Sequence, residues 1–171
     1  TADLVRGLSV PYAEAQKAKE HYGTAFAQLV DPRETVEVPG PSPGQKRAVA
    51  RELIAHIIEQ RLDEMFGLVQ GELQDRDLID NLGAGVVLTG GTVAIPGIVE
   101  LAQQIFASPV RLGVPNEGLS GLAESVQRPQ FAIATGLALW GADRFMETGR
   151  GASTITSGMF TKLGTWLKEF F

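Results

Sequence analysis

Two glycines between a predicted strand and a predicted helix are the residues best placed to hold a ligand. The apolar, β-branched run Gly85–Leu88 is typical of a short buried strand, and Gly90 and Gly91 follow it after one residue. Beyond Pro96, apolar residues recur at the spacing of one helix face. In an open α/β sheet, ligands bind beyond the carboxyl ends of the strands, and glycine lets another group lie against the backbone. On its own, the pattern is more typical of an ordinary turn than of a ligand site.

A second polar group lies near the start of the chain, on a helix that is predicted to run from about Pro11 to Tyr22. Gln16, Lys19 and Glu20 stand at positions i, i+3 and i+4 of this helix and therefore share a face. On an isolated helix, such a stripe is more typical of a solvated charged surface than of a binding site.

Composition excludes several classes of site. The chain has 171 residues, a formal net charge of −5, no cysteine and two histidines. The negative charge argues against a nucleic-acid partner, whose binding surfaces are basic. Without cysteine there is neither a disulfide nor a thiolate metal site, and His21 and His56 lack ligand-like spacing, so no metal site is predicted. The chain starts at Thr1 without a methionine, and we expect it to be a processed or excised piece.

The elements that must position these residues follow from local patterns. The segment 35–38 alternates like an edge strand, and a proline- and glycine-rich loop follows at 39–44. Apolar residues at helical spacing predict a long helix over about 47–73, and a further short strand is predicted at 110–112. The segment 129–141 is apolar on all sides, which predicts a buried helix with a neighbour packed closely against Gly136.

The carboxyl-terminal end changes character. Residues 148–157 are typical of a flexible tether, and 158–171 form a predicted amphipathic helix. At about 20 Å this helix is too short to span a bilayer, but its apolar face could lie in the membrane interface. The alternative is that it docks on its own domain or on a neighbour. The face predicted to bind lipid comprises Phe160, Leu163, Trp166, Leu167, Phe170 and Phe171.

The string Leu88-Thr-Gly-Gly-Thr, followed by Ile95-Pro96-Gly97, resembles the adenosine loop of the actin, Hsp70 and sugar-kinase ATPases. The helix with Gln16 resembles the one that lies across the nucleotide from that loop, although bacterial relatives usually carry glutamate at this position. Gln130 is a weaker match to a residue that approaches the base. The resemblance implies an ATP site whose adenosine-facing residues are Lys19, Glu20, Gly90, Gly91, Thr92, Ala94 and Ile95.

Together with the terminal amphipathic helix, these motifs resemble the carboxyl-terminal half of the FtsA family of actin-like bacterial cell-division proteins. The implied fold is α/β: part of an actin-like (ribonuclease H-like) ATPase fold, namely its second large domain with a small inserted subdomain. The implied segments are a nucleotide-proximal subdomain at 1–26 and 83–147, the inserted subdomain at 27–82, a linker at 148–157 and a membrane-targeting helix at 158–171.

The resemblance also implies partners and a location. The C-terminal tail of FtsZ, the tubulin-like division protein, would dock on the inserted subdomain, with Arg47, Arg51 and Arg61 as candidate contacts. The family forms filaments of its own and ties FtsZ filaments to the inner face of the cytoplasmic membrane at the division site, through lipids bound by the terminal helix.

No catalytic residue is predicted. Actin-like ATPases carry their first phosphate loop and the acid that handles magnesium and water in the other half of the molecule, and the chain has no Gly-Lys-Ser/Thr loop. The site for the magnesium that accompanies ATP would therefore lie mostly outside this chain. We expect the chain alone to hold the adenosine side of ATP weakly and to hydrolyse nothing.

Two alternatives remain open. The chain could be the actin-like component of a pilus assembly platform, which has the same fold but would bind the tail of an inner-membrane protein. It could also be the ATP half of a sugar kinase or phosphatase of the same superfamily, although the tether and terminal helix argue against an enzyme.

Overall fold

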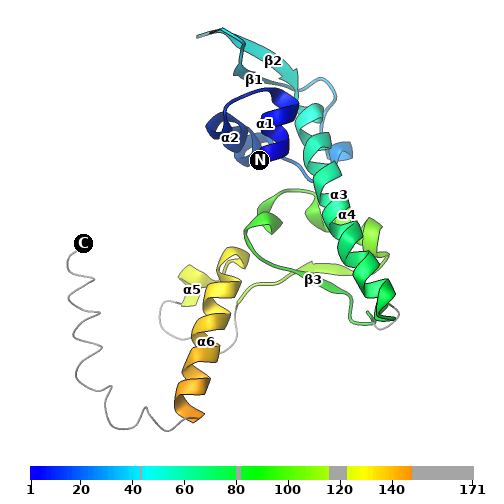
Figure 1. The fold of residues 1–171 in the computed structure, drawn as a ribbon, viewed down its shortest axis with the longest axis vertical. Helices are drawn as coiled ribbons and strands as arrows, with labels where there is room; N and C mark the ends of the chain where they lie inside the picture. Colours follow the sequence, from blue (N-terminus) through cyan, green and yellow to red (C-terminus); the bar gives the residue numbers. More distant parts are fainter. Residues whose placement is uncertain (43, 80–81, 116–122, 148–171) are drawn as a thin grey trace, which may run out of the picture.

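A single long helix, α3 (Arg51–Asp75), organises the protein. The computed structural model describes residues 1–42, 44–79, 82–115 and 123–147. Figure 1 shows α3 running along the molecule, with the amino-terminal elements gathered near its first turns and the later elements near its far end. The helices α1 (Ala2–Leu8) and α2 (Tyr12–Tyr22) pack against each other and against α3.

A hairpin leads directly into α3. After the short 3-10 helix η1 (Ala27–Leu29), strand β1 (Thr35–Pro39) pairs antiparallel with β2 (Lys46–Ala50), with Val36 opposite Val49. These two valines are buried, whereas most of the alternate positions are exposed, as expected for a two-stranded ribbon with one covered face. The predicted strand at 35–38 is confirmed.

The predicted start of the long helix is wrong. Residues 46–50, of which Arg47 is one, form strand β2, and α3 begins at Arg51 and ends at Asp75. The short segment has no strong helical or strand preference of its own, and its pairing with β1, together with burial of Val49, decides its conformation.

The predicted unit around the glycines is confirmed. Strand β3 (Val86–Leu88) is followed by the 3-10 helix η3 (Gly91–Ala94), helix α4 (Ile98–Phe106) and strand β4 (Val110–Leu112). β3 and β4 are parallel neighbours, with Val86 opposite Val110. The glycines therefore lie at the carboxyl end of a parallel strand, where the sequence predicted them.

The core lies between the first half of α3 and the elements around it. Leu4, Leu8 and Ile54 are its largest fully buried side chains. Farther along α3, the rings of Phe66 and Phe106 lie 5.7 Å apart and join α3 to α4. The Gln70 side chain adds a polar link, because its amide donates to the carbonyl of Ile105 at 2.6 Å.

The last described elements are α5 (Ala123–Val126), the 3-10 helix η4 (Pro129–Phe131) and α6 (Ala132–Glu147). The helix is present, but the prediction that it is buried is wrong: most of its apolar side chains are exposed. Leu137 is 63% exposed, and nothing lies within 4 Å of where a Cβ of Gly136 would be. None of the helices in the described ranges is long and apolar enough to cross a membrane.

Candidate functional site

We call residues 90–96, between β3 and α4, the glycine loop. A cavity of about 610 Å³ opens where α2, α3 and this loop meet. One wall is the start of α1 with the carboxyl-terminal half of α2, a second is the middle of α3, and the third is the segment from Gly91 to Pro96. Its lining residues are Thr1, Asp3, Leu4, Lys19, Glu20, Gly23, Ile57, Ile58, Arg61, Leu62, Met65, Gly91, Thr92, Ala94, Ile95 and Pro96.

The structure brings together two groups of residues that the sequence analysis connected only through a resemblance. Six of the seven residues predicted to face adenosine line this one cavity, from opposite walls: Lys19 and Glu20 on α2, and Gly91, Thr92, Ala94 and Ile95 in and after η3. The local causes are simple. Gly23 ends α2 beside the cavity, and the 3-10 turn places its own backbone on the opposite wall.

The seventh predicted residue, Gly90, shapes the loop without lining the cavity. Its φ of 101° and ψ of 179° lie in a region that is essentially restricted to glycine. Its N–H donates to the carbonyl of Pro129 at 3.0 Å, and the neighbouring Thr89 hydroxyl donates to the carbonyl of Gly113 at 2.9 Å. Gln130 is exposed and is not among the lining residues.

Gly91 has a different role from its neighbour. Its φ is not positive, and nothing lies within 4 Å of where its Cβ would be. Since Gly91 lines the cavity, a Cβ there would meet no other atom of the fold, and a larger side chain would extend into space that is open to a ligand.

The carboxylate of Glu20 is held by a short relay of hydrogen bonds. The Thr1 hydroxyl donates to the side-chain carbonyl of Gln16 at 2.6 Å, and the Gln16 amide group donates to the Glu20 carboxylate. A glutamate at position 16 would lack that amide donor and would repel Glu20. The glutamine therefore suits this arrangement, in which Glu20 lies at the cavity edge ready to accept hydrogen bonds.

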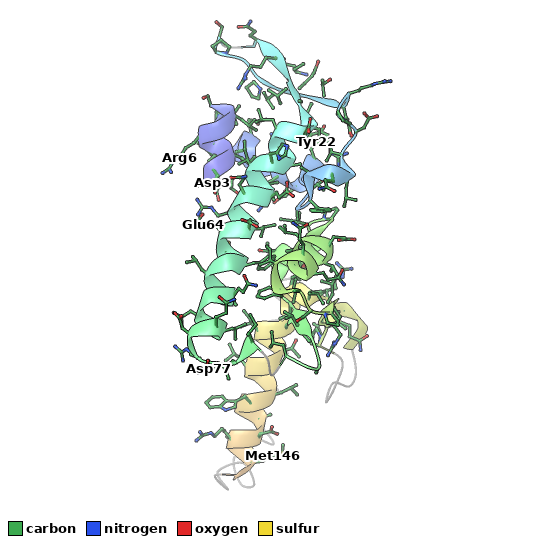
Figure 2. The ribbon with its side chains drawn as sticks, turned by 90° about the vertical axis from the view of Figure 1, so that its right-hand side faces the viewer. Asp3, Arg6, Tyr22, Glu64, Asp77 and Met146 are labelled. Carbon is green, nitrogen blue, oxygen red and sulfur yellow. The ribbon has the colours of Figure 1, made fainter. Side chains whose placement is uncertain are left out.

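Asp3 and Arg61 form an ion pair on the same rim, although they are 58 positions apart in the sequence. The Arg61 Nε donates to one Asp3 carboxylate oxygen at 2.9 Å, and Nη2 donates to the other at 2.6 Å. These hydrogen bonds and the charge of Arg61 hold the pKa of Asp3 below its ordinary value, and the pair raises the pKa of Arg61. Arg61 also contacts a second acid, because its Nη1 lies 2.7 Å from a carboxylate oxygen of Glu64. Figure 2 shows Glu64 near Asp3.

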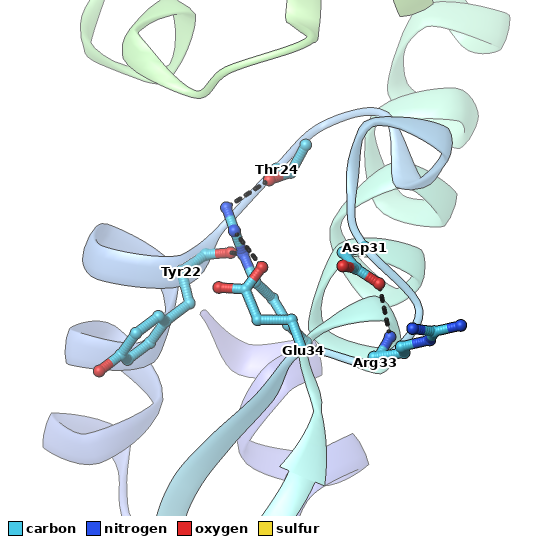
Figure 3. Close-up of polar contacts among 6 residues, drawn as sticks. Tyr22, Thr24, Asp31, Arg33 and Glu34 are labelled. Carbon is cyan, nitrogen blue, oxygen red and sulfur yellow. Dashed lines mark hydrogen bonds and ion pairs between the residues drawn. The ribbon is translucent and has the colours of Figure 1, made fainter.

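The other two arginines that were predicted to bind a partner make hydrogen bonds within the chain. Arg51 donates to the carbonyl of Tyr22 at 3.1 Å, to the Glu34 carboxylate at 2.8 Å and to the Thr24 hydroxyl at 3.3 Å (Figure 3). Arg47 donates to the carbonyl of Leu8. Arg51 thus ties the end of α2 to the hairpin and α3, and its side chain is 26% exposed, against 46% for Arg61.

A second cavity of about 620 Å³ lies on the other side of Arg61. Its lining residues are Asp3, His56, Ile57, Gln60, Arg61, Asp63 and Glu64. Three acids and one arginine make it acidic, with Ile57 as an apolar patch. Sequence reasoning missed Asp3 and this cavity, because no local pattern connects the first turn of α1 with the middle of α3.

Other sites can be placed only in part. Across the described ranges there is no group of three or more histidine, aspartate and glutamate side chains that could hold a metal ion. The six residues predicted to bind lipid, from Phe160 to Phe171, lie outside the described residues.

A family model described as cell division protein FtsA matches residues 1–136, which include both cavities and the glycine loop. The chain belongs to the FtsA family. Among its curated FtsA relatives, the protein of Pseudomonas aeruginosa is 40% identical over 158 residues, covering 92% of this chain and 37% of the relative. That of Neisseria meningitidis is 43% identical over 138 residues, covering 80% and 33%. That of Escherichia coli K12 is 30% identical over 176 residues, covering 99% and 41%.

The chain therefore spans about two fifths or less of the length of these FtsA relatives. The matched part contains the glycine loop and the whole of helices α1, α2 and α3. Family membership is consistent with the mixed helix and strand content of the structure and with the resemblance found in the sequence.

Proposed function

We propose that this chain supplies the adenosine-binding wall of an actin-like, ATP-binding cell-division protein. The observation that carries the proposal is the meeting of Lys19 and Glu20 with the Gly91–Ile95 segment across one cavity. Membership of the FtsA family, whose curated relatives are named cell division proteins, supports the cell-division role.

The cavity has the size and chemistry that a nucleoside requires. Its volume of about 610 Å³ falls within the usual range for small-molecule sites. Apolar side chains such as Ile58 and Leu62 offer a surface for a purine ring, and the Glu20 carboxylate can accept hydrogen bonds from ribose hydroxyls. The Lys19 ammonium adds a donor and a positive charge. In this proposal these residues bind and orient a ligand.

The parallel β3–α4–β4 unit supports an actin-like (ribonuclease H-like) fold for the longer protein. In open α/β sheets, ligands bind at the carboxyl ends of parallel strands, and the glycine loop follows β3 there. In this arrangement, residues 27–82 form the small inserted subdomain, and 1–26 with 83–147 form the nucleotide-proximal subdomain.

The acidic cavity beside Arg61 is where the FtsZ tail would dock. Peptide segments commonly place an apolar side chain in a pocket and fix their register with charged groups at its rim. Here Ile57 provides the apolar surface, while Asp63 and Arg61 provide charges of both signs. Arg51 is less suited to this role than Arg61, because its side chain is 26% exposed against 46% for Arg61. Filament formation and membrane attachment through residues 158–171 complete the proposed function.

Substitution of Gly91 by leucine tests the adenosine site. We expect the 171-residue chain to bind adenosine in equilibrium dialysis, and Gly91→Leu to lower the affinity by about tenfold or more, because the new side chain occupies the cavity. The matched control is Gly67→Leu, at a glycine of α3 that also has open space beside it but does not line the cavity. Unchanged adenosine affinity in Gly91→Leu, or no binding by the parent chain, would contradict the proposal.

A further inference from the structure

The Asp3–Arg61 pair is a shared wall between the two cavities. Asp3, Ile57 and Arg61 are the three residues that line both. A ligand in either cavity therefore lies beside the same ion pair.

The guanidinium group keeps an edge free for a ligand while it holds Asp3. Of its five N–H groups, Nε and one on Nη2 point to Asp3, and one on Nη1 points to Glu64. Two N–H groups remain, one on each Nη. They can donate to a carbonyl or carboxylate oxygen while Nε and Nη2 stay on Asp3.

The backbones under the pair are firmly held, whereas its side chains are partly open. Leu4, next to Asp3, is 1% exposed and Leu62, next to Arg61, is 4% exposed. By contrast, the side chains of Arg61 and Asp3 are 46% and 28% exposed. Holding a partly exposed arginine and its acid in one geometry costs side-chain entropy, which limits how firmly the pair alone fixes Arg61.

We propose that Asp3 is a positioning residue that fixes Arg61 for the tail peptide and thereby couples the adenosine cavity to the peptide cavity. This inference rests on the proposed function. A nucleoside in the first cavity packs against the pair and restricts it. The entropy of ordering Arg61 is then lost when the nucleoside binds and is not lost again when the peptide binds. The peptide then binds a side chain that is already in place, which produces positive coupling between the two ligands.

The coupling can be measured with the full 171-residue chain and a fluorescently labelled synthetic peptide of the FtsZ C-terminal tail. Peptide affinity is determined by fluorescence anisotropy with and without saturating adenosine. For the parent chain we expect adenosine to raise the peptide affinity by about fivefold, and by reciprocity the peptide to raise the adenosine affinity by the same factor. For Asp3→Asn, which keeps the size of the side chain, we expect that factor to fall to about one while both ligands still bind.

Two further variants separate positioning from a general loss of charge or of structure. Asp63→Asn removes an acid that lines only the peptide cavity, so peptide affinity can change but the coupling factor stays at the parent value. Asp3→Glu keeps the carboxylate and restores coupling above that of Asp3→Asn, whereas a merely structural role would give equal factors in the two variants. Circular dichroism checks that each variant is folded.

The outcomes distinguish this inference from the proposed function. If the parent chain binds neither adenosine nor the peptide, the proposed function fails and the coupling fails with it. If both ligands bind but the factor is about one in the parent, or is unchanged in Asp3→Asn, the coupling alone is overturned.

Discussion

Helices α3 and α6 are both rich in apolar residues, yet the first half of α3 is buried and α6 is largely exposed. In α3, Ile54 is 0% exposed and Leu62 is 4% exposed. In α6, Ile133 is 72% exposed and Leu137 is 63% exposed. The difference comes from their neighbours, because α3 packs against α1, α2, the hairpin and α4, whereas the packing of α6 within the described residues is mainly against η4.

The contrast shows what apolar composition can and cannot predict. An apolar stripe indicates that a helix suits apolar surroundings, because burial of each large apolar side chain contributes about 1.5–3 kcal/mol. It does not say which residues supply those surroundings. For the first half of α3 they lie in this chain. For α6 the described residues supply few of them.

The contrast is tested most strongly by the same substitution in the two helices. We expect Ile54→Ala to lower the free energy of unfolding by about 2–5 kcal/mol, because it leaves a hole in a closely packed core. Ile133→Ala, at an exposed position, should change it by about 0.5 kcal/mol or less. Urea denaturation followed by circular dichroism measures both. Equal losses in the two variants would mean that α6 is buried in solution and would remove the contrast.

Smaller changes in stability are expected when glycines are replaced by alanine, and their sign differs between the two regions. At Gly23, a Cβ would collide with the carbonyl oxygen of Lys19 and lie 3.0 Å from Ile58 Cδ1, so Gly23→Ala should destabilise the protein by about 1–3 kcal/mol. At Gly136 there is open space, and Gly136→Ala should stabilise α6 by up to about 1 kcal/mol through helix propensity. Thermal melts of the two variants give the signs. A destabilised Gly136→Ala variant would support the close packing that the sequence predicted there.

Local patterns predicted the elements around the glycine loop well. The β-branched run before the loop and the helical spacing after Pro96 are signals contained in a few neighbouring residues, and β3, α4 and β4 appear where those signals place them. Strand β2 was missed because its conformation depends on pairing with β1 across a loop. No periodicity within five residues can encode that pairing.

The candidate site divides in the same way. The glycine loop and the Lys19–Glu20 face were found because each is a continuous stretch of sequence. The link between Asp3 and Arg61 could not be found, since the two residues meet only after α1 has packed on α3. Arg51 was predicted to contact a partner through the resemblance alone, and its hydrogen bonds to the carbonyl of Tyr22 and the carboxylate of Glu34 become visible only in the structure.

The smallest expected effect concerns one arginine on each helix and the group that it contacts. Arg61 of α3 pairs with an acid on another helix, whereas Arg144 of α6 lies 5.1 Å from the ring centre of Trp140 in its own helix. The hydrogen bonds that the Asp3 carboxylate accepts from Arg61, and then the charge of Arg61, hold the pKa of Asp3 below 3.8 in the folded protein. A carboxyl group with a lower pKa in the folded than in the unfolded state stabilises the fold above the unfolded value. That contribution is lost as the pH falls through the folded value.

We therefore expect Arg61→Gln to raise the pKa of Asp3 towards 3.8. The part of the free energy of unfolding that is lost at low pH because Asp3 becomes protonated should then be smaller. Arg144→Gln should leave the pKa of Asp3 unchanged, because that arginine belongs to the other region. Carboxyl ¹³C NMR titration of the two variants and the parent measures the pKa directly. If Asp3 titrates identically in the parent and in Arg61→Gln, the pair does not form in solution, and the first turns of α1 are then joined to α3 by apolar packing alone.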